Sequence, residues 1–281
     1  MKKKTIDMRE MTAQNPMEGK KVVFIRDESD KENADGIRGH LEAVGMSHHK
    51  PGFYEKYVKR AIDVVLSLVG VVLLSPLWLV IIIVMEIDDP GPIVFSQKRI
   101  GQNKRYFKLH KFRSMKSSTP HDVPTHMLEN PEQYITRAGR FMRKHSIDEL
   151  VQVVDILVGS MSIIGPRPAL WNQDVLVAER DKYGANDIKP GLTGWAQING
   201  RDELEIPVKA KLDGEYAAKL NKGGFGAFAF DCRCFFGTIF SVLRGEGVVE
   251  GGTGTVHTSP INPNDGKTLG GENDDQVGDK E

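Results

Sequence analysis

The feature that most constrains this chain is an apolar stretch at residues 62–87, which carries no charged side chain between Val64 and Met85. An α-helix needs about 20 predominantly apolar residues to cross a bilayer, so the stretch is long enough for a full crossing. A soluble domain of this length does not require such a segment. The sequence therefore predicts that the chain contacts a membrane through these residues.

Ser75 and Pro76 lie in the middle of the stretch. Proline lacks an amide hydrogen and its ring clashes with the preceding turn, so it kinks a helix. The serine hydroxyl can bond back to a carbonyl that has lost its partner. We therefore predict that Ser75 and Pro76 break the membrane helix.

Basic residues flank the apolar stretch on both sides, and such flanks prefer the cytosolic side of a membrane. They are Lys56, Lys59 and Arg60 before it, and Lys98, Arg99, Lys104, Arg105, Lys108, Lys111 and Arg113 after it. A re-entrant helix, which enters the membrane and returns, keeps both flanks inside. A single-pass helix that tolerates the proline places one flank outside, and the stretch alone leaves both arrangements open.

The charge totals conceal a segregated pattern. Lys+Arg and Asp+Glu both number 38, so the formal net charge is zero, yet the surroundings of the apolar stretch are basic and the end of the chain is acidic. The local pattern indicates a membrane surface or phosphates as partners, and we expect no nucleic acid partner. The only cysteines, Cys232 and Cys234, cannot form a disulfide framework and indicate a reducing, cytosolic compartment.

Composition divides the chain into four segments. They are a polar extension at 1–52, an interfacial lead-in with the membrane helix at 53–92, a folded domain at 93–250, and a disordered acidic tail at 251–281. We expect the extension to be flexible or loosely docked, with a short strand at residues 20–25 and a short helix at residues 34–44.

Periodicity and turn residues predict an α/β fold whose domain is mainly helical, with one small β-hairpin. The hairpin strands are expected at residues 93–95 and 106–109. Helices are expected at residues 132–145, 147–157, 171–183, 204–220 and 225–243. Ser146 precedes the second helix and has Glu149 three residues on, which is the spacing of a capping box.

Adjacent carboxylates, Asp148 and Glu149, open this second helix. Alone, they are typical of a solvated helix start, where the dipole favours acidic residues. Fixed cations elsewhere in the chain favour a phosphorylated substrate, because arginine binds phosphate in a bidentate fork. The cations are Arg143, Arg167 between two prolines, Lys111 and Arg113. Carboxylates also bind Mg²⁺ together with substrate phosphates, and one at a helix start can attack phosphorus.

Six motifs follow in order between Arg60 and Gly247. They are Arg60 and Asp63 ahead of Ser75-Pro76, then GPIVFSQKRIG, KFRSM, RKHSIDEL, SIIGPRP and KPGLTGWAQINGR. In this order they resemble those of the bacterial sugar transferases, the monotopic polyprenyl-phosphate phosphoglycosyltransferases. With a polar start in place of several membrane spans, the chain is similar to the small form of that family.

The resemblance implies a re-entrant membrane helix broken at Ser75 and Pro76, and a compact catalytic domain (93–250) on the cytosolic face of the bacterial inner membrane. It implies that Asp148 attacks the sugar-bearing phosphate of a UDP-sugar, that UMP leaves, and that polyprenyl (undecaprenyl) phosphate then takes the phosphosugar. Such a step begins the assembly of exopolysaccharide, capsule, O-antigen or glycoprotein glycans.

The resemblance also implies site residues. Asp148 and Glu149 would bind Mg²⁺ or orient the phosphates, and Asp213 matches a further acidic position. The implied phosphate-binding residues are Lys111, Arg113, Arg143, Arg167 and Arg201. Membrane lipids are implied partners, and a homodimer stays open.

The chain departs from the family pattern at two places. Val151 stands where the family has proline, which affects only the helix start. Residues 222–227 replace a tryptophan-rich segment, which bears on the C-terminal interfacial helix. Two other classes stay open: a membrane-bound interaction protein without turnover, and a single-pass sensor with a soluble tail.

Overall fold

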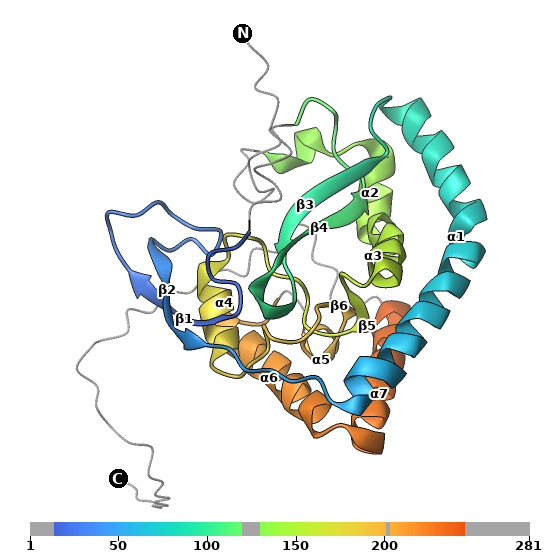
Figure 1. Ribbon diagram of the computed structural model, residues 1–281. Helices are drawn as coiled ribbons and strands as arrows, with labels where there is room; N and C mark the ends of the chain where they lie inside the picture. Colours follow the sequence, from blue (N-terminus) through green and yellow to red (C-terminus); the bar gives the residue numbers. More distant parts are fainter. Residues whose placement is uncertain (1–13, 120–129, 201–202, 245–281) are drawn as a thin grey trace, which may run out of the picture.

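A computed structural model describes residues 14–119, 130–200 and 203–244 (Figure 1). Its elements are β1 (Lys20–Arg26), β2 (Gly39–Met46), the π-helix η2 (Tyr54–Lys59), α1 (Arg60–Asp88), β3 (Val94–Ile100), the 3₁₀-turn η3 (Gln102–Lys104), β4 (Tyr106–Phe112), the 3₁₀-turn η5 (Pro131–Tyr134), α2 (Arg137–Lys144), the 3₁₀-helix η6 (Ile147–Gln152), α3 (Val153–Val158), β5 (Ser162–Ile164), α4 (Asp174–Asp181), β6 (Gly191–Thr193), α5 (Trp195–Ile198), α6 (Ile206–Lys222) and α7 (Gly224–Arg244). The described part is a mixed helix and strand fold in which helices dominate, as the sequence predicts.

The long apolar helix α1 continues without interruption through Pro76, so the predicted break is not observed. Pro76 has no amide hydrogen for the carbonyl of Val72, four residues before it. The Ser75 hydroxyl donates to that carbonyl at 2.8 Å and replaces the missing bond. The helix is bowed along one side of the molecule instead of broken (Figure 1).

The first turns of α1 are fixed to the domain by polar contacts. Arg60 donates to the carbonyls of Ile156 and Leu157, at 2.7 and 2.8 Å, where α3 ends. The buried Asp63 carboxylate accepts hydrogen bonds from the hydroxyl of Ser162 and the amide of Ile163, both at 3.0 Å.

The last turns of α1 are fixed by apolar contacts. Ile81 and Met85 are buried against Phe112 of β4 and Met142 of α2. One folded domain therefore binds both ends of the same helix, so the helix cannot leave the domain at either end.

Between its two ends, α1 exposes apolar side chains. The chief ones are Val65, Leu68, Val72, Leu73, Leu79, Val80, Ile83 and Ile87. Among the described residues one helical stretch, Tyr54–Asp88, is long and apolar enough to cross a membrane, and only 11% of its most apolar window is buried. A core helix would be mostly buried, so this face is free to meet an apolar medium.

Residues 14–52 differ from the expected flexible extension, because β1 and β2 form an antiparallel hairpin docked on α4. The Val22 side chain is buried, and its amide donates to the Asp181 carboxylate at 2.7 Å. The buried Asp35 carboxylate accepts hydrogen bonds from the amides of Val175 and Leu176 at the start of α4. The helix expected at residues 34–44 is not observed: residues 34–36 form a turn, and residues 39–44 belong to the strand β2, which pairs with β1.

The expected hairpin is confirmed and is longer than predicted, with β3 and β4 paired over seven residues each. A second contact, the parallel pair of β5 and β6, depends on close approach of two backbones. A Cβ at Gly191 would lie 2.1 Å from the amide nitrogen of Gly165, so this glycine is required by packing. The pair fixes the chain just before Arg167.

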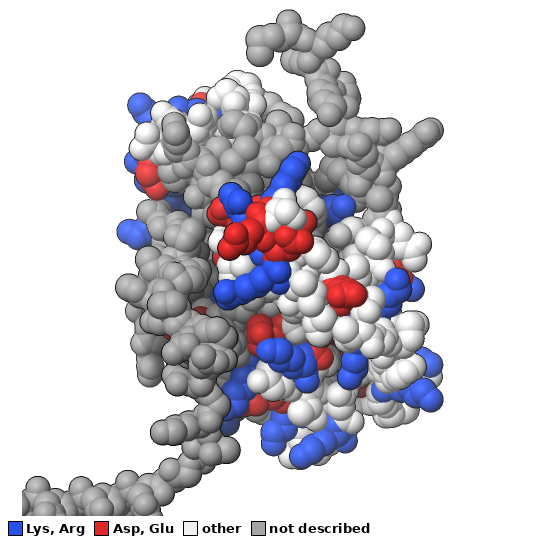
Figure 2. Space-filling view, turned by 90° about the vertical axis from the view of Figure 1, so that its left-hand side faces the viewer, with Lys and Arg blue, Asp and Glu red and all other residues white. Residues whose placement is uncertain are grey.

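Charged side chains gather on the side of the molecule opposite α1, in the middle of the view in Figure 2, where the hairpin β1–β2 lies. Acidic residues of the β1–β2 loop contribute to this surface, among them Asp27, Glu28, Asp30 and Glu32. The molecule thus has a charged side and, along α1, an apolar one.

The substitution Asp35→Ala tests the docking of the hairpin. It removes the acceptor for two amides of α4, and we expect a loss of about 1–2 kcal/mol in the free energy of unfolding. Denaturant unfolding of the detergent-solubilised protein measures it. The control Glu42→Ala removes an exposed carboxylate of the same hairpin and is expected to stay within about 0.5 kcal/mol of the parent. Equal stability of both variants would contradict the docking role.

Candidate active site

The carboxylate pair follows a sharp turn between α2 and η6. Ser146 occupies the left-handed region, with φ 53°, which is uncommon for a residue other than glycine. Its side chain makes no capping hydrogen bond, so the predicted capping box is not formed. The turn instead directs Glu149 toward cations of other segments.

Both oxygens of Glu149 are held by cations. Lys111 Nζ lies 2.7 Å from Oε1, Arg167 Nη2 lies 2.6 Å from the same oxygen, and Arg167 Nη1 donates to Oε2 at 3.2 Å. Burial raises the pKa of Glu149, but Arg167 and Lys111 outweigh it and hold this pKa well below its usual range. Glu149 is therefore a permanent anion that fixes two cations.

Asp148 is equally buried but is not closely paired. Its nearest cation is Lys111, with Nζ 3.8 Å from Oδ2, and its side chain makes no hydrogen bond with any described residue. Burial raises the pKa of Asp148, Lys111 lowers it, Glu149 raises it, and Arg143 and Arg167 lower it. Asp148 is thus the carboxylate of the pair with oxygens available to a ligand.

Arg143 reaches the pair from α2. Its Nε donates to the Ser114 hydroxyl at 2.8 Å, and its charge acts on Asp148. The closeness of α2 to the end of β4 depends on Gly139, where a Cβ would lie 1.9 Å from the Ser114 carbonyl oxygen. Lys111, Arg143 and Arg167 therefore surround Asp148 and Glu149 from three separate segments.

Asp213 lies behind Arg167 and does not join the pair directly. Its carboxylate oxygen Oδ2 accepts from Arg180 Nε at 2.8 Å and contacts Nη2 at 2.6 Å. Arg180 Nη1 donates to the main-chain oxygen of Arg167 at 2.9 Å. Burial raises the pKa of Asp213, and the Arg180 guanidinium opposes this. Asp213 thus acts on the site through Arg180, which sequence reasoning missed. The sequence feature that could have identified Arg180 is its charge on the buried face of α4.

Arg113 is engaged elsewhere. Its guanidinium pairs with Asp89, at 2.7 Å from Nη1 to Oδ2, and also contacts Ser117 and the Asp89 carbonyl. Arg113 therefore fixes the C-terminal end of α1. The structure does not place it at the phosphate site, where the sequence predicts it. Arg201, also expected there, lies outside the described residues.

His110 and Asp155 form a second contact that sequence reasoning missed. His110 Nδ1 lies 2.6 Å from Asp155 Oδ1, and the His110 amide donates to Oδ2 at 3.0 Å. Asp155 is buried in α3, so the contact joins β4 to α3 beside the carboxylate pair. The two residues lie 45 positions apart, and no motif links them.

The donor set fits Mg²⁺ in part. Mg²⁺ is usually held by one or two carboxylates together with substrate phosphates. Asp148 offers free oxygens, whereas both oxygens of Glu149 already accept from cations. Among the described residues, the three-residue group that could hold a metal is Asp27, Asp30 and His40 on the hairpin, away from this pair.

Comparison with known proteins identifies the family of the chain. The sequence profile of the family described as bacterial sugar transferase matches residues 54–245. The chain belongs to this family.

Two relatives differ in how much of their length the chain covers. It is 35% identical to UDP-glucose:undecaprenyl-phosphate glucose-1-phosphate transferase of Escherichia coli (strain K12), over 66% of this chain and 40% of that protein. It is 34% identical to exopolysaccharide production protein PSS of Rhizobium leguminosarum bv. phaseoli, over 68% of this chain and 98% of that protein.

A third relative carries a name with another sugar. The chain is 30% identical to UDP-N-acetylgalactosamine-undecaprenyl-phosphate N-acetylgalactosaminephosphotransferase of Aeromonas hydrophila, over 74% of this chain and 49% of that protein. The relatives named for a UDP-sugar are thus longer proteins of which this chain spans half or less.

The substitution Asp213→Ala tests the support of Arg167. It leaves the Arg180 guanidinium buried without its carboxylate, and breaking a buried pair in this way costs about 3–5 kcal/mol. We expect that loss in denaturant unfolding of the detergent-solubilised protein. The control Glu215→Ala removes an exposed carboxylate on the same helix and is expected to cost less than about 1 kcal/mol. An Asp213→Ala variant as stable as the control would show that the ion pair of Arg180 and Asp213 does not contribute to stability.

Proposed function

We propose that this protein transfers a sugar 1-phosphate from a UDP-sugar to a polyprenyl phosphate and releases UMP. The observation that carries the proposal is Asp148, a buried carboxylate without a close partner beside Lys111, Arg143 and Arg167. The names of the relatives support a nucleotide sugar and undecaprenyl phosphate as substrates. These names differ in the sugar, so the proposal extends to a UDP-sugar, with plain and N-acetylated sugars both open.

In the first step, an Asp148 oxygen attacks the phosphorus that bears the sugar. The bond from that phosphorus to the bridging oxygen breaks, UMP leaves with this oxygen, and an acyl phosphate forms on Asp148. In the second step, an oxygen of the polyprenyl phosphate attacks the same phosphorus, and the Asp148 carboxylate leaves. The product is a polyprenyl diphosphate sugar, and the charge lost as UMP is balanced by the incoming phosphate.

The surrounding side chains have separate tasks in this mechanism. Lys111, Arg143 and Arg167 stabilise the charge that develops on the transferred phosphoryl group. Glu149 holds two of these cations in place before substrate binds, which reduces the reorganisation required in the transition state. Burial strips water from Asp148, and a desolvated carboxylate is a better nucleophile.

Mg²⁺ is part of the proposal. Asp148 and the substrate phosphates would hold it, and Glu149 would act through the cations that it already binds. When bound, the ion neutralises part of the charge of the diphosphate.

We further propose that α1 lies, unbroken, in the cytosolic leaflet of the bacterial inner membrane, with both of its ends on the cytosolic side as a re-entrant segment would have them. A helix that crossed the bilayer would require the domain on both sides, yet one domain binds both of its ends. The exposed apolar face of α1 supports burial in lipid, and Phe-rich α7, with Phe225, Phe236 and Phe240 exposed, supports an interfacial position.

An inactive interaction protein on the same scaffold is the second candidate. Nothing in that role requires a buried carboxylate without a hydrogen-bond partner among the described residues, because burying it costs stability. Release of UMP from a UDP-sugar in membranes that contain polyprenyl phosphate distinguishes the two. A panel of UDP-sugars in the same assay identifies the sugar.

The substitutions Asp148→Asn and Glu149→Gln separate the nucleophile from its neighbour. We expect Asp148→Asn to abolish both UMP release and labelling of the protein by a donor labelled in the sugar. Glu149→Gln is expected to lower turnover by about 100- to 1,000-fold, because it frees two cations, while some labelled protein still forms. Labelled Asp148→Asn protein, or UMP release only after the lipid acceptor is added, would refute the covalent step.

The acid limb of the pH–rate profile tests the electrostatics. Asp148 must be ionised to attack, so activity falls as the pH drops through its pKa. Lys111 lowers this pKa, and Lys111→Met is therefore expected to move the acid limb of kcat/KM to higher pH, beside any loss of rate. The control Lys108→Met removes the same charge from the same strand. An unmoved limb, or an equal shift in the control, would contradict the assignment.

A further inference from the structure

A small cavity lies where the lead-in helix η2 and the first turn of α1 meet the segment before β6. It measures about 160 Å³, and four cations line it: Lys56, Lys59, Arg60 and Lys189. None of these residues belongs to the carboxylate site. At about 30 Å³ per water molecule, the volume equals about five waters and holds a compact polar group.

The two carboxylates that line the cavity already have partners. His49 Nε2 lies within hydrogen-bond distance of both carboxylate oxygens of Glu55, at 3.1 Å from Oε1 and 2.9 Å from Oε2. Asp63 accepts from Ser162 and Ile163. Glu55 is therefore engaged through both of its oxygens, whereas both contacts of Asp63 fall on its Oδ1.

The donors of the cavity retain unused capacity. Lys189 is half-buried, and its ammonium makes no hydrogen bond or ion pair with any described residue. Burial lowers the pKa of Lys189, and the Arg60 charge lowers it further. The charges of Asp63 and Glu55 oppose this and raise the pKa of Lys189. Lys59 uses one of its three donors on Asp231, at 2.9 Å. Four cations against two carboxylates leave the lining with a net positive charge, so the cavity is suited to a ligand rich in acceptors.

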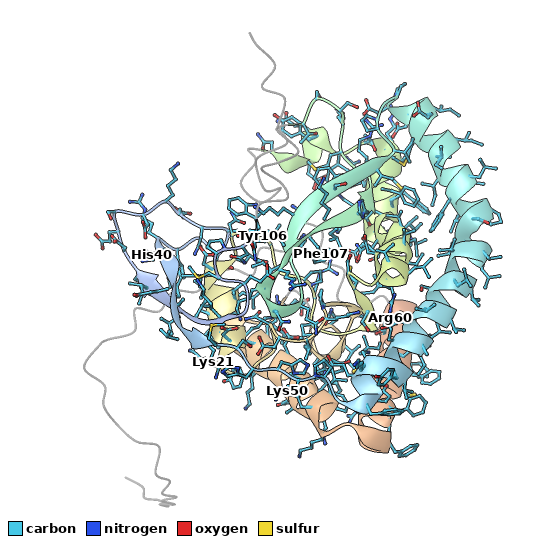
Figure 3. The ribbon with its side chains drawn as sticks, in the orientation of Figure 1. Lys21, His40, Lys50, Arg60, Tyr106 and Phe107 are labelled. Carbon is cyan, nitrogen blue, oxygen red and sulfur yellow. The ribbon has the colours of Figure 1, made fainter. Side chains whose placement is uncertain are left out.

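The cavity adjoins the apolar surface of the molecule. On η2 and just before it, the aromatic side chains of Tyr57 and Phe53 are 54% and 75% exposed. Aromatic side chains of this kind are typical of the headgroup level of a membrane. Figure 3 shows Arg60 between the first turns of α1 and the end of α3. The cavity that Arg60 lines therefore lies at the N-terminal end of α1.

We infer that this cavity binds the phosphate of an anionic phospholipid headgroup, with Lys189 as the principal cation. The inference rests on the membrane placement proposed above. The site is separate from the reaction, because the lining of the cavity shares no residue with the carboxylate pair and its cations. A phosphate held here therefore fixes the height and orientation of the domain on the bilayer and does not react.

Native mass spectrometry of the full chain in detergent tests the inference, with phosphatidylglycerol, phosphatidylcholine and inorganic phosphate as probes. We expect phosphatidylglycerol to bind more tightly than phosphatidylcholine. Lys189→Gln is expected to weaken the binding of phosphatidylglycerol by at least about tenfold, the usual effect of losing a charged hydrogen bond. The control Lys219→Gln removes an exposed charge from α6 and is expected to bind like the parent.

Each other outcome overturns the inference. Equal retention of phosphatidylglycerol by the parent and Lys189→Gln would place the lipid elsewhere. Displacement of phosphatidylglycerol by an equal concentration of inorganic phosphate would identify a free-phosphate site in place of a lipid site. Thermal unfolding of the same samples verifies that Lys189→Gln is folded. The lipid readout needs no turnover, so a failure of UMP release, measured in parallel, reports on the proposed reaction alone.

Discussion

The ion pairs that join the buried Glu149 to the half-buried Arg167 and Lys111 are the interaction on which the site depends. Each charge in such a group is costly to bury alone and acceptable only with its partner, so the pairs fix the relative positions of η6, β4 and the loop after β5. The same logic continues outward through Arg180 and Asp213, which join α4 and α6 to the main chain of Arg167. Electrostatic pairing thus sets the geometry at Asp148, where apolar packing alone would allow several arrangements.

A second constraint acts at larger scale. Polar contacts bind the start of α1 and apolar contacts bind its end, so the helix and the domain behave as one body. The apolar face of α1 and the charged hairpin lie on opposite sides of the molecule, and this polarity orients it toward a surface (Figures 1 and 2). The carboxylate site lies in between, on the elements that the end of α1 packs against.

Local sequence patterns predicted many of the helices and strands of this fold. Alternation and turn residues located the β3–β4 hairpin, and periodicity located α4, α6 and α7, because each depends on neighbours in the chain. Long-range partners were not accessible in this way. Residues 39–44, expected within a helix, pair with β1 instead. Arg113, although close to Lys111 in sequence, pairs with Asp89. The motif order identified Asp148 and Glu149, but only coordinates show that Glu149 is closely paired through both oxygens and that Asp148 has a single, longer contact with Lys111.

The single hydroxyl of Ser75 couples two neighbouring positions. With α1 in lipid, as proposed above, the carbonyl of Val72 has no water to bond, and an orphaned polar group there costs several kcal/mol. The Ser75 hydroxyl supplies the bond that Pro76 cannot, so loss of the serine costs more beside the proline than beside any residue that carries an amide hydrogen. Replacements at the two positions are therefore not additive.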